Sequence, residues 1–139
     1  MYVELSDEAR RYMGRFDELT GVAPRDCLVE GDRLVFVIPA GEMAAAIGQG
    51  GTTVTEAEQR LGRSVELVED ADTPESFVAS ALAPAAVTAV TISEQDDRVA
   101  YVEVAPADRG VAIGADGQNI ETARTLAKRH YDVDDVQLT

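Results

Sequence analysis

Two stretches of the sequence share one pattern, Ile47-Gly48-Gln49-Gly50-Gly51-Thr52-Thr53-Val54 and Ile113-Gly114-Ala115-Asp116-Gly117-Gln118-Asn119-Ile120. Each follows an alanine, so both read Ala-Ile-Gly-x-x-Gly-x-x-Val/Ile. One Gly-x-x-Gly alone is a weak signal, because glycine is common in turns of every kind. The same pattern repeated at a constant offset is specific and indicates an internal duplication.

The sequence around the first stretch predicts three helices and three strands. Ser6 is suited to cap a helix whose apolar positions recur with helical spacing until Gly21. Apolar runs on either side of Glu30-Gly31-Asp32 indicate a hairpin. The expected elements of residues 1–70 are a helix over 7–20, strands over 27–29 and 34–38, a helix over 42–47, the glycine loop, a helix from the capping box Thr53-Val54-Thr55-Glu56 to Gly62, and a strand over 64–68.

The same order of elements is predicted again in residues 71–139. The acidic stretch 69–72 is interpreted as the linker between the copies, and Thr73 is expected to cap the next helix, with Pro74 at its first position. The expected elements are a helix that ends before Pro84, strands over 86–92 and 98–104 around the turn 94–97, a helix over 107–113, the second glycine loop, a helix over 118–131, and a strand that contains Val136 and Leu138.

The duplicated loop and the order of elements resemble the type II KH domain, and in detail the tandem KH domains of the archaeal NusA-like family. The resemblance covers nearly all 139 residues and extends to Asp26-Cys27, Gly41-Glu42-Met43, Asp108-Arg109-Gly110 and the segment 130–136. It implies an α+β fold of two tandem type II KH domains, 1–70 and 71–139. Each is expected to run helix-strand-strand-helix-GxxG-helix-strand, with helices packed on a three-stranded mixed sheet. It also implies a protein that binds single-stranded RNA in transcription termination or antitermination.

The glycine loops are the candidate RNA-binding sites. Glycines let the backbone turn sharply and let a sugar-phosphate chain approach without meeting a Cβ, and amide groups at 51–54 and 117–120 are expected to face the same place. KH loops clamp about four nucleotides, with bases over an apolar groove. The resemblance thus places the RNA-contacting residues at Ile47, Gly48, Gln49, Gly50, Gly51 and Val54 in the first loop, and at Ile113, Gly114, Ala115, Asp116, Gly117 and Ile120 in the second. In the alternative interpretation, the four apolar residues of this set belong to the core.

Neither loop has the lysine or arginine that KH loops usually carry between the glycines. The first has Gln49-Gly50 and the second Ala115-Asp116, and the Asp116 carboxylate should repel a phosphate. The first loop is therefore the preferred site of RNA contact. Nearby cations are expected to restore positive potential, or else to pair with local carboxylates on solvated helix faces. They are Arg109, Arg124, Lys128 and Arg129 for the second loop and Arg60 and Arg63 for the first.

The composition is strongly acidic. Twenty-six acidic residues against 12 basic ones give a net charge of −14, and 11 of the 12 basic residues are arginine, a combination associated with proteins kept soluble in molar salt. Taken alone, this charge argues against a polyanionic partner. Molar salt shortens the Debye length to about 3 Å, so contacts through backbone amides and apolar groups would be favoured over lysine contacts.

The sequence offers little support for catalysis, a cofactor or a metal. No Lys follows either loop as a P-loop requires, and Thr53 stands where a Rossmann fingerprint needs glycine. His130 is expected to serve a helix end or packing, and Cys27 to pack as a small apolar residue. The aspartates at 132, 134 and 135 lack the full ligand spacing of a calcium loop, and a surface turn explains them as well as a divalent cation site does. The single cysteine and the lack of a signal or membrane-spanning segment predict a cytoplasmic protein.

A second function remains open. The chain could be an interaction module that keeps the KH scaffold but contacts RNA polymerase or a ribosomal protein, with RNA binding weak or lost. The missing loop cations and the acidic surface favour this alternative. The sequence does not predict an oligomeric state.

Overall fold

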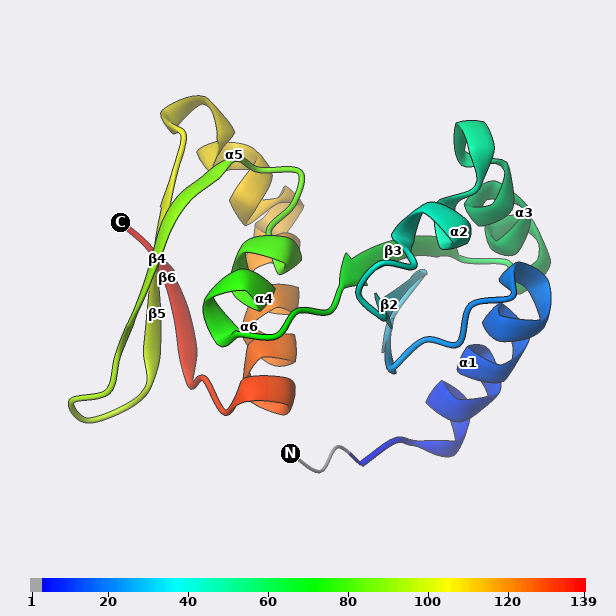
Figure 1. Cartoon of the computed structure of the whole chain (residues 1–139), viewed down its shortest axis with the longest axis horizontal. Coiled ribbons are helices and arrows are strands. Elements are labelled where there is room, and N and C mark those ends of the chain that lie inside the picture. The colour runs from blue at the N-terminus through cyan, green and yellow to red at the C-terminus, as the bar shows by residue number, and fades with distance from the viewer. Residues whose placement is uncertain (1–3) are drawn as a thin grey trace. The chain divides into compact units, whose positions relative to one another are not determined.

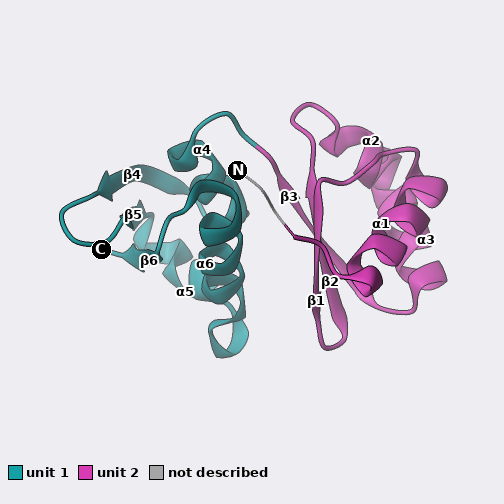
Figure 2. Ribbon diagram, turned by 90° about the horizontal axis from the view of Figure 1, so that it is seen from below, with its two compact units in different colours: residues 1–3, 71–139 teal, residues 4–70 magenta. Residues whose placement is uncertain are grey.

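The computed structural model describes residues 4–139 and contains two compact units, Glu4–Asp70 and Ala71–Thr139 (Figure 2). The elements of the first are α1 (Asp7–Thr20), β1 (Asp26–Glu30), β2 (Arg33–Ile38), α2 (Met43–Ile47), α3 (Thr52–Leu61) and β3 (Ser64–Glu69) (Figure 1). Those of the second are α4 (Pro74–Ala81), β4 (Val87–Ser93), β5 (Val99–Val104), α5 (Arg109–Ile113), α6 (Gln118–Tyr131) and β6 (Asp135–Leu138). The same order of elements occurs twice, which confirms the predicted duplication.

Each unit has a three-stranded mixed sheet. The orders are β1-β2-β3 and β4-β5-β6, with the first pair antiparallel and the second parallel. On the middle strand of the first sheet, Phe36 lies opposite Cys27 and Leu67. On that of the second, Ala100 lies opposite Ile92 and Val136. The predicted α+β fold, with helices on a mixed sheet, is confirmed.

The core of the first unit lies between α1 and the sheet. Phe16 of α1 stacks on Phe36 of β2 with ring centroids 4.3 Å apart, and both side chains are fully buried. The helix begins as predicted, because the Ser6 hydroxyl accepts the Ala9 amide at 3.0 Å, and it ends at Gly21 with φ 76°. Burying two phenylalanines contributes about 3–6 kcal/mol from apolar area alone.

The second core is built around Phe77 of α4, which is fully buried. Its ring centroid lies 5.2 Å from that of Tyr131 and 5.7 Å from that of His130, both in the last turn of α6. Leu126 of the same helix and Val102 of β5 are also fully buried. His130 therefore packs against Phe77, as the sequence predicts.

Three local predictions need correction. Gly51, at φ 77°, begins α3 at Thr52, so Thr53 lies inside the first turn and forms no capping box. The linker does not include Glu69, which belongs to β3, nor Asp70, whose amide donates to the Ile38 carbonyl at 2.8 Å. The short helix predicted from residue 107 begins at 109, because a turn of 3-10 helix, Pro106–Asp108, precedes it.

Candidate functional site

The first glycine loop connects α2 to α3 through one turn of 3-10 helix, Gln49–Gly51. Its three glycines have φ angles of 78°, 65° and 77°, the left-handed region that other residues rarely adopt. At Gly48 the chain also passes very close to α3. A Cβ there would lie 2.6 Å from the Cβ of Thr53 and 2.8 Å from its backbone nitrogen, so only glycine fits.

The second loop repeats this conformation residue by residue. Gly114 and Gly117 have φ angles of 78° and 76°, and Asp116, at 55°, takes the place of Gly50. A Cβ at Gly114 would lie 2.9 Å from the backbone nitrogen of Asn119, the counterpart of Thr53. The side-chain amide of Asn119 donates to the Val111 carbonyl at 2.9 Å. The two loops thus share one backbone framework and differ in the charge at its tip.

The loop amides are less available than the sequence predicts. Gly51 donates to the Gly48 carbonyl at 3.0 Å, and Thr52 donates to the Gln49 carbonyl. The second loop makes the same turn, with Gly117 donating to the Gly114 carbonyl at 3.1 Å. The sequence predicts free amides at 51–54 and 117–120. This prediction is wrong for the first two residues of each range, because their amides donate within the 3-10 turn.

Each loop is preceded by an exposed isoleucine. Ile47 is 37% exposed and Ile113 is 39% exposed, so the alternative that these two belong to the core is wrong. Ile120 is buried, and Val54 is half-buried, so they fit the alternative better. Val111, 42% exposed on α5, adds apolar surface beside the second loop. Nothing in the sequence marks Val111 as exposed, because periodicity carries little information in a helix of five residues.

The cations expected to support the second loop are engaged elsewhere. Arg124 pairs with Glu121 and, at 2.9 Å, with Asp135. Lys128 bonds to Asp132 at 3.0 Å and to Asp134 at 2.8 Å. The guanidinium of Arg109 donates to the Thr139 carbonyl at 2.7 Å. The alternative of cations paired with local carboxylates thus describes Arg124 and Lys128.

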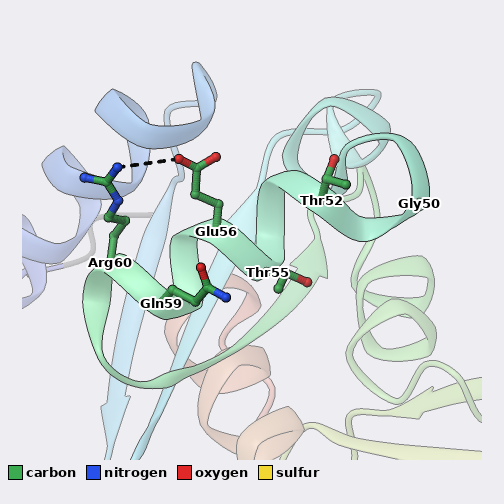
Figure 3. A pocket seen from close by; sticks show the side chains of 6 residues that line it. All are labelled: Gly50, Thr52, Thr55, Glu56, Gln59 and Arg60. Atoms are coloured by element: carbon green, nitrogen blue, oxygen red, sulfur yellow. Dashed lines mark ion pairs between the residues drawn. The ribbon is translucent and has the colours of Figure 1, made fainter.

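A shallow depression of about 540 Å³ lies on α3 beside the first loop (Figure 3). Arg60 and Glu56, which both line it, point toward each other along α3, with nitrogen and oxygen 3.9 Å apart. Arg63 does not line this depression; its Nε donates to the Tyr12 hydroxyl of α1 at 2.9 Å. The lining residues are Gly50, Thr52, Thr55, Glu56, Gln59 and Arg60, a polar set without a nucleophile and base pair.

The carboxylates around Lys128 form a charged cluster at the end of α6. Hydrogen bonds from Lys128 and from the Arg98 amide lower the pKa of Asp134. Hydrogen bonds to Asp134 and Asp132 raise the pKa of Lys128 to about 12. Partial burial raises the pKa of Asp135, but hydrogen bonds from Gln137 and the Val136 amide and the charge of Arg124 outweigh it, so that pKa is lowered overall.

This cluster predicts a pH-dependent contribution to stability. Because the folded pKa of Asp134 lies below its ordinary value of 3.8, its contribution is present above that pH and lost as the pH falls further. Asp134→Asn is therefore expected to lower the melting temperature at pH 7 by about 2 °C, and the difference should shrink as the pH falls below 3.8. Thermal unfolding followed by circular dichroism measures it. Asp97→Asn is the control; an Asp134→Asn effect that persists at pH 2 would contradict the assignment.

Cys27 is buried, and its environment disfavours the thiolate. Burial, followed by the charges of Asp26 and Glu8, raises the pKa of the thiol to about 12. We expect labelling of the folded protein by a thiol reagent at pH 8 to be about a thousandfold slower than labelling of the unfolded chain. A chromogenic disulfide reagent releases a coloured thiolate on labelling, so its absorbance measures both rates. Complete labelling of the folded protein within minutes would contradict the raised pKa of Cys27.

No group of three potential metal ligands gathers among residues 4–139. No helix in that part of the chain is long and apolar enough to cross a membrane.

Comparison with known proteins matches both halves of the chain to KH domains. A family model of the KH domain matches residues 10–73, and one of the NusA-like second KH domain matches residues 74–138. The probable transcription termination protein NusA of Halobacterium salinarum is 60% identical over the full length of both chains. That of Methanocaldococcus jannaschii is 30% identical, over 98% of this chain and 75% of its own. A crystal structure of APE1850 superposes with a TM-score of 0.84 at 28% identity, covering 97% of this chain and all of the other.

Proposed function

This chain belongs to the NusA-like family of transcription termination proteins with two KH domains, and from that premise we propose that it binds single-stranded RNA along its glycine loops. One observation carries the proposal. Both loops adopt the same left-handed conformation, and each presents an exposed isoleucine directly before its first glycine. The cellular role we propose is termination or antitermination of transcription in the cytoplasm.

The loop geometry suits a nucleic-acid backbone. Apart from Gly50 and its two chain neighbours, no residue has an atom within 4 Å of the position that a Cβ would take at Gly50, so a sugar-phosphate chain can approach the main chain there. Ile47 adds exposed apolar surface on which a base can lie. Contact of this kind works with every base, because each base has an apolar face.

The first loop is the stronger contact in this proposal. Gly50 leaves the tip of the first loop uncharged, whereas Asp116 places a carboxylate at the same point of the second loop. Its charge opposes a phosphate by about 1 kcal/mol at 4 Å in water. With Arg124 and Lys128 engaged by carboxylates, the second loop lacks the compensation that the sequence suggested.

The direct test is a titration of a labelled random-sequence single-stranded RNA in 1 M potassium chloride. We expect Gln49→Asp/Gly50→Asp to raise the dissociation constant by about threefold or more. Asp is compatible with the backbone at position 50, because Asp116 has φ 55° in the equivalent place. The control, Ser76→Asp/Gln95→Asp, adds the same charge at exposed positions outside both loops. Equal binding by wild type and loop variant would remove the first loop from the mechanism.

The affinity for RNA is expected to depend weakly on salt. Four neutralised phosphates on a single strand would give a slope of about −2.8 for log affinity against log salt. Neither loop carries a cation, so we expect a slope shallower than about −1. Titrations between about 0.5 and 3 M potassium chloride measure it, and a slope near −3 would show that arginines make the main contacts.

An alternative function is a protein-interaction module that contacts RNA polymerase or the ribosome and binds RNA weakly or not at all. The ion pairs of Arg124 and Lys128 favour it, because they leave little positive potential near the second loop. Recovery of polymerase subunits after nuclease treatment, without an RNA crosslink, would support this alternative. A crosslink within residues 48–53 would support RNA binding.

A further inference from the structure

The edge strand β4 differs from every other strand edge in residues 4–139. Four strands lie at sheet edges there, and three of them carry carboxylates: Asp26 and Glu30 in β1, Glu66 and Glu69 in β3, and Asp135 in β6. The fourth, β4, spans seven residues and carries no charge. Soluble proteins commonly place charges on edge strands to prevent pairing with other chains. In so highly charged a protein, this uncharged edge is a candidate for strand pairing.

The internal duplication makes this difference sharper. β1 occupies the same place in the first sheet as β4 does in the second, at the edge next to the middle strand and antiparallel to it. β1 has only five residues and begins and ends with a carboxylate. β4 is longer and consists of valine, threonine, alanine, isoleucine and serine, mostly residues that favour strands. The two equivalent edges therefore differ in length and charge, and the bulge of β4 between Val87 and Ala89 leaves residues 89–93 as its regular, uncharged part.

The two faces of β4 differ in character. Val90 and Ile92 lie opposite the buried Val102 and Ala100, so they belong to the inner face, yet they remain half-buried because the sheet ends there. On the outer face Thr91 is exposed and lies opposite Tyr101, itself 38% exposed. A further strand would extend the apolar inner face and have an aromatic ring within reach on the outer face.

The charges next to this edge select the partner. The turn after β4 contains Glu94, Asp96 and Asp97, and of these only Glu94 has an ion pair among the described residues, with Arg98 at 2.8 Å. On the outer face, the exposed Glu103 lies opposite Ala89. The strand that fits would carry apolar side chains inward and basic side chains outward, toward these carboxylates and the ring of Tyr101. A second copy of this chain would instead bring the same acidic turn against it.

We propose that β4 is a docking edge for an extended, basic segment of a partner protein, which adds to the second sheet as a fourth strand. Backbone hydrogen bonds give the affinity in such complexes, and alternate side chains give the specificity. Those hydrogen bonds are little affected by molar salt, unlike long-range charge attraction. The edge opposite β4 is β6, which is tied to the start of α5 by the bond from Arg109 to the Thr139 carbonyl. Docking at β4 is therefore independent of RNA binding at the loops.

The test uses a seven-residue capped peptide in which valine alternates with arginine, titrated into the labelled full chain and followed by amide chemical shifts. We expect shifts confined to residues 87–97 and the facing residues of β5. Thr91→Lys should weaken binding by about tenfold or more, and Gln137→Lys, the same charge on the opposite edge, by less than about twofold. A peptide with glutamate in place of arginine, and one with N-methylated alternate amides, should not bind.

Several results would overturn the proposal. They are equal effects of the two lysine variants, shifts located elsewhere, binding of the N-methylated peptide, or no binding of the arginine peptide. Self-association of the chain that Thr91→Lys abolishes would show that a second copy occupies the edge. Unchanged shift dispersion verifies the fold of each variant. RNA affinity should be the same in wild type and Thr91→Lys, so failure here leaves the function of the loops untouched.

Discussion

Replacing Gly48 with alanine is expected to lower the free energy of unfolding of the first unit by about 3 kcal/mol. Two costs add. The φ of 78° is unfavourable for any residue with a Cβ, and the new methyl group would lie 2.8 Å from the backbone nitrogen of Thr53. Because that contact includes the main chain of α3, rotation of a side chain cannot relieve it. Chemical denaturation and hydrogen exchange of the β2 amides measure the loss.

The matched control is Gly50→Ala, two residues further in the same loop. Gly50 also has a positive φ, 65°, but the position of its absent Cβ is open. This variant carries the conformational cost alone, about 1 kcal/mol. The difference between the two variants isolates the close approach of the loop to α3. Equal losses would mean that this approach does not hold the turn between α2 and α3.

The duplication was the part of the fold most accessible from sequence. The octet that ends at Val54 and its copy that ends at Ile120 mark one structural position twice. The first glycine of each, Gly48 and Gly114, passes so close to the following helix that only glycine fits. The cap at Ser6 and the stop at Gly21 were also predictable, because both act through the residue's own backbone or side chain. Local signals of this kind depend little on tertiary contacts.

The predictions that failed involve competition between local signals or contacts far apart in the chain. Thr53 has a good capping side chain, but the left-handed Gly51 starts the helix first. Pairing of Arg124 with a local carboxylate, Glu121, fits the alternative interpretation, but its second partner, Asp135, lies on a strand that only the folded sheet brings beside α6. A helix as short as α2 offers too few residues for periodicity to show that Ile47 is exposed. The chemistry of each loop was therefore predictable, but its electrostatic surroundings were not.

Exchanging the tip residues of the two loops is expected to reverse their contributions to RNA binding. Gly50→Asp should weaken binding of single-stranded RNA by about two- to fivefold, and Asp116→Gly should strengthen it by a similar factor. The physical reason is that both positions have the same left-handed backbone, with φ angles of 65° and 55°. The substitutions therefore change charge and access at the tip while the framework is kept. Fluorescence anisotropy in 1 M potassium chloride measures each affinity.

The double exchange, Gly50→Asp with Asp116→Gly, moves one carboxylate from the second loop to the first and leaves the net charge of −14 unchanged. Any change in RNA binding then reports where the carboxylate lies and not how many charges the chain carries. If the tip carboxylate alone ranks the loops, the double variant should bind about as tightly as wild type, with RNA crosslinks moved from residues 48–53 to residues 114–119. If its affinity falls to that of Gly50→Asp, the second domain lacks more than an uncharged tip. The ion pairs of Arg124 and Lys128 with Asp135 and Asp134 then become the limiting feature. An unchanged affinity for Gly50→Asp itself would contradict contact at the first loop.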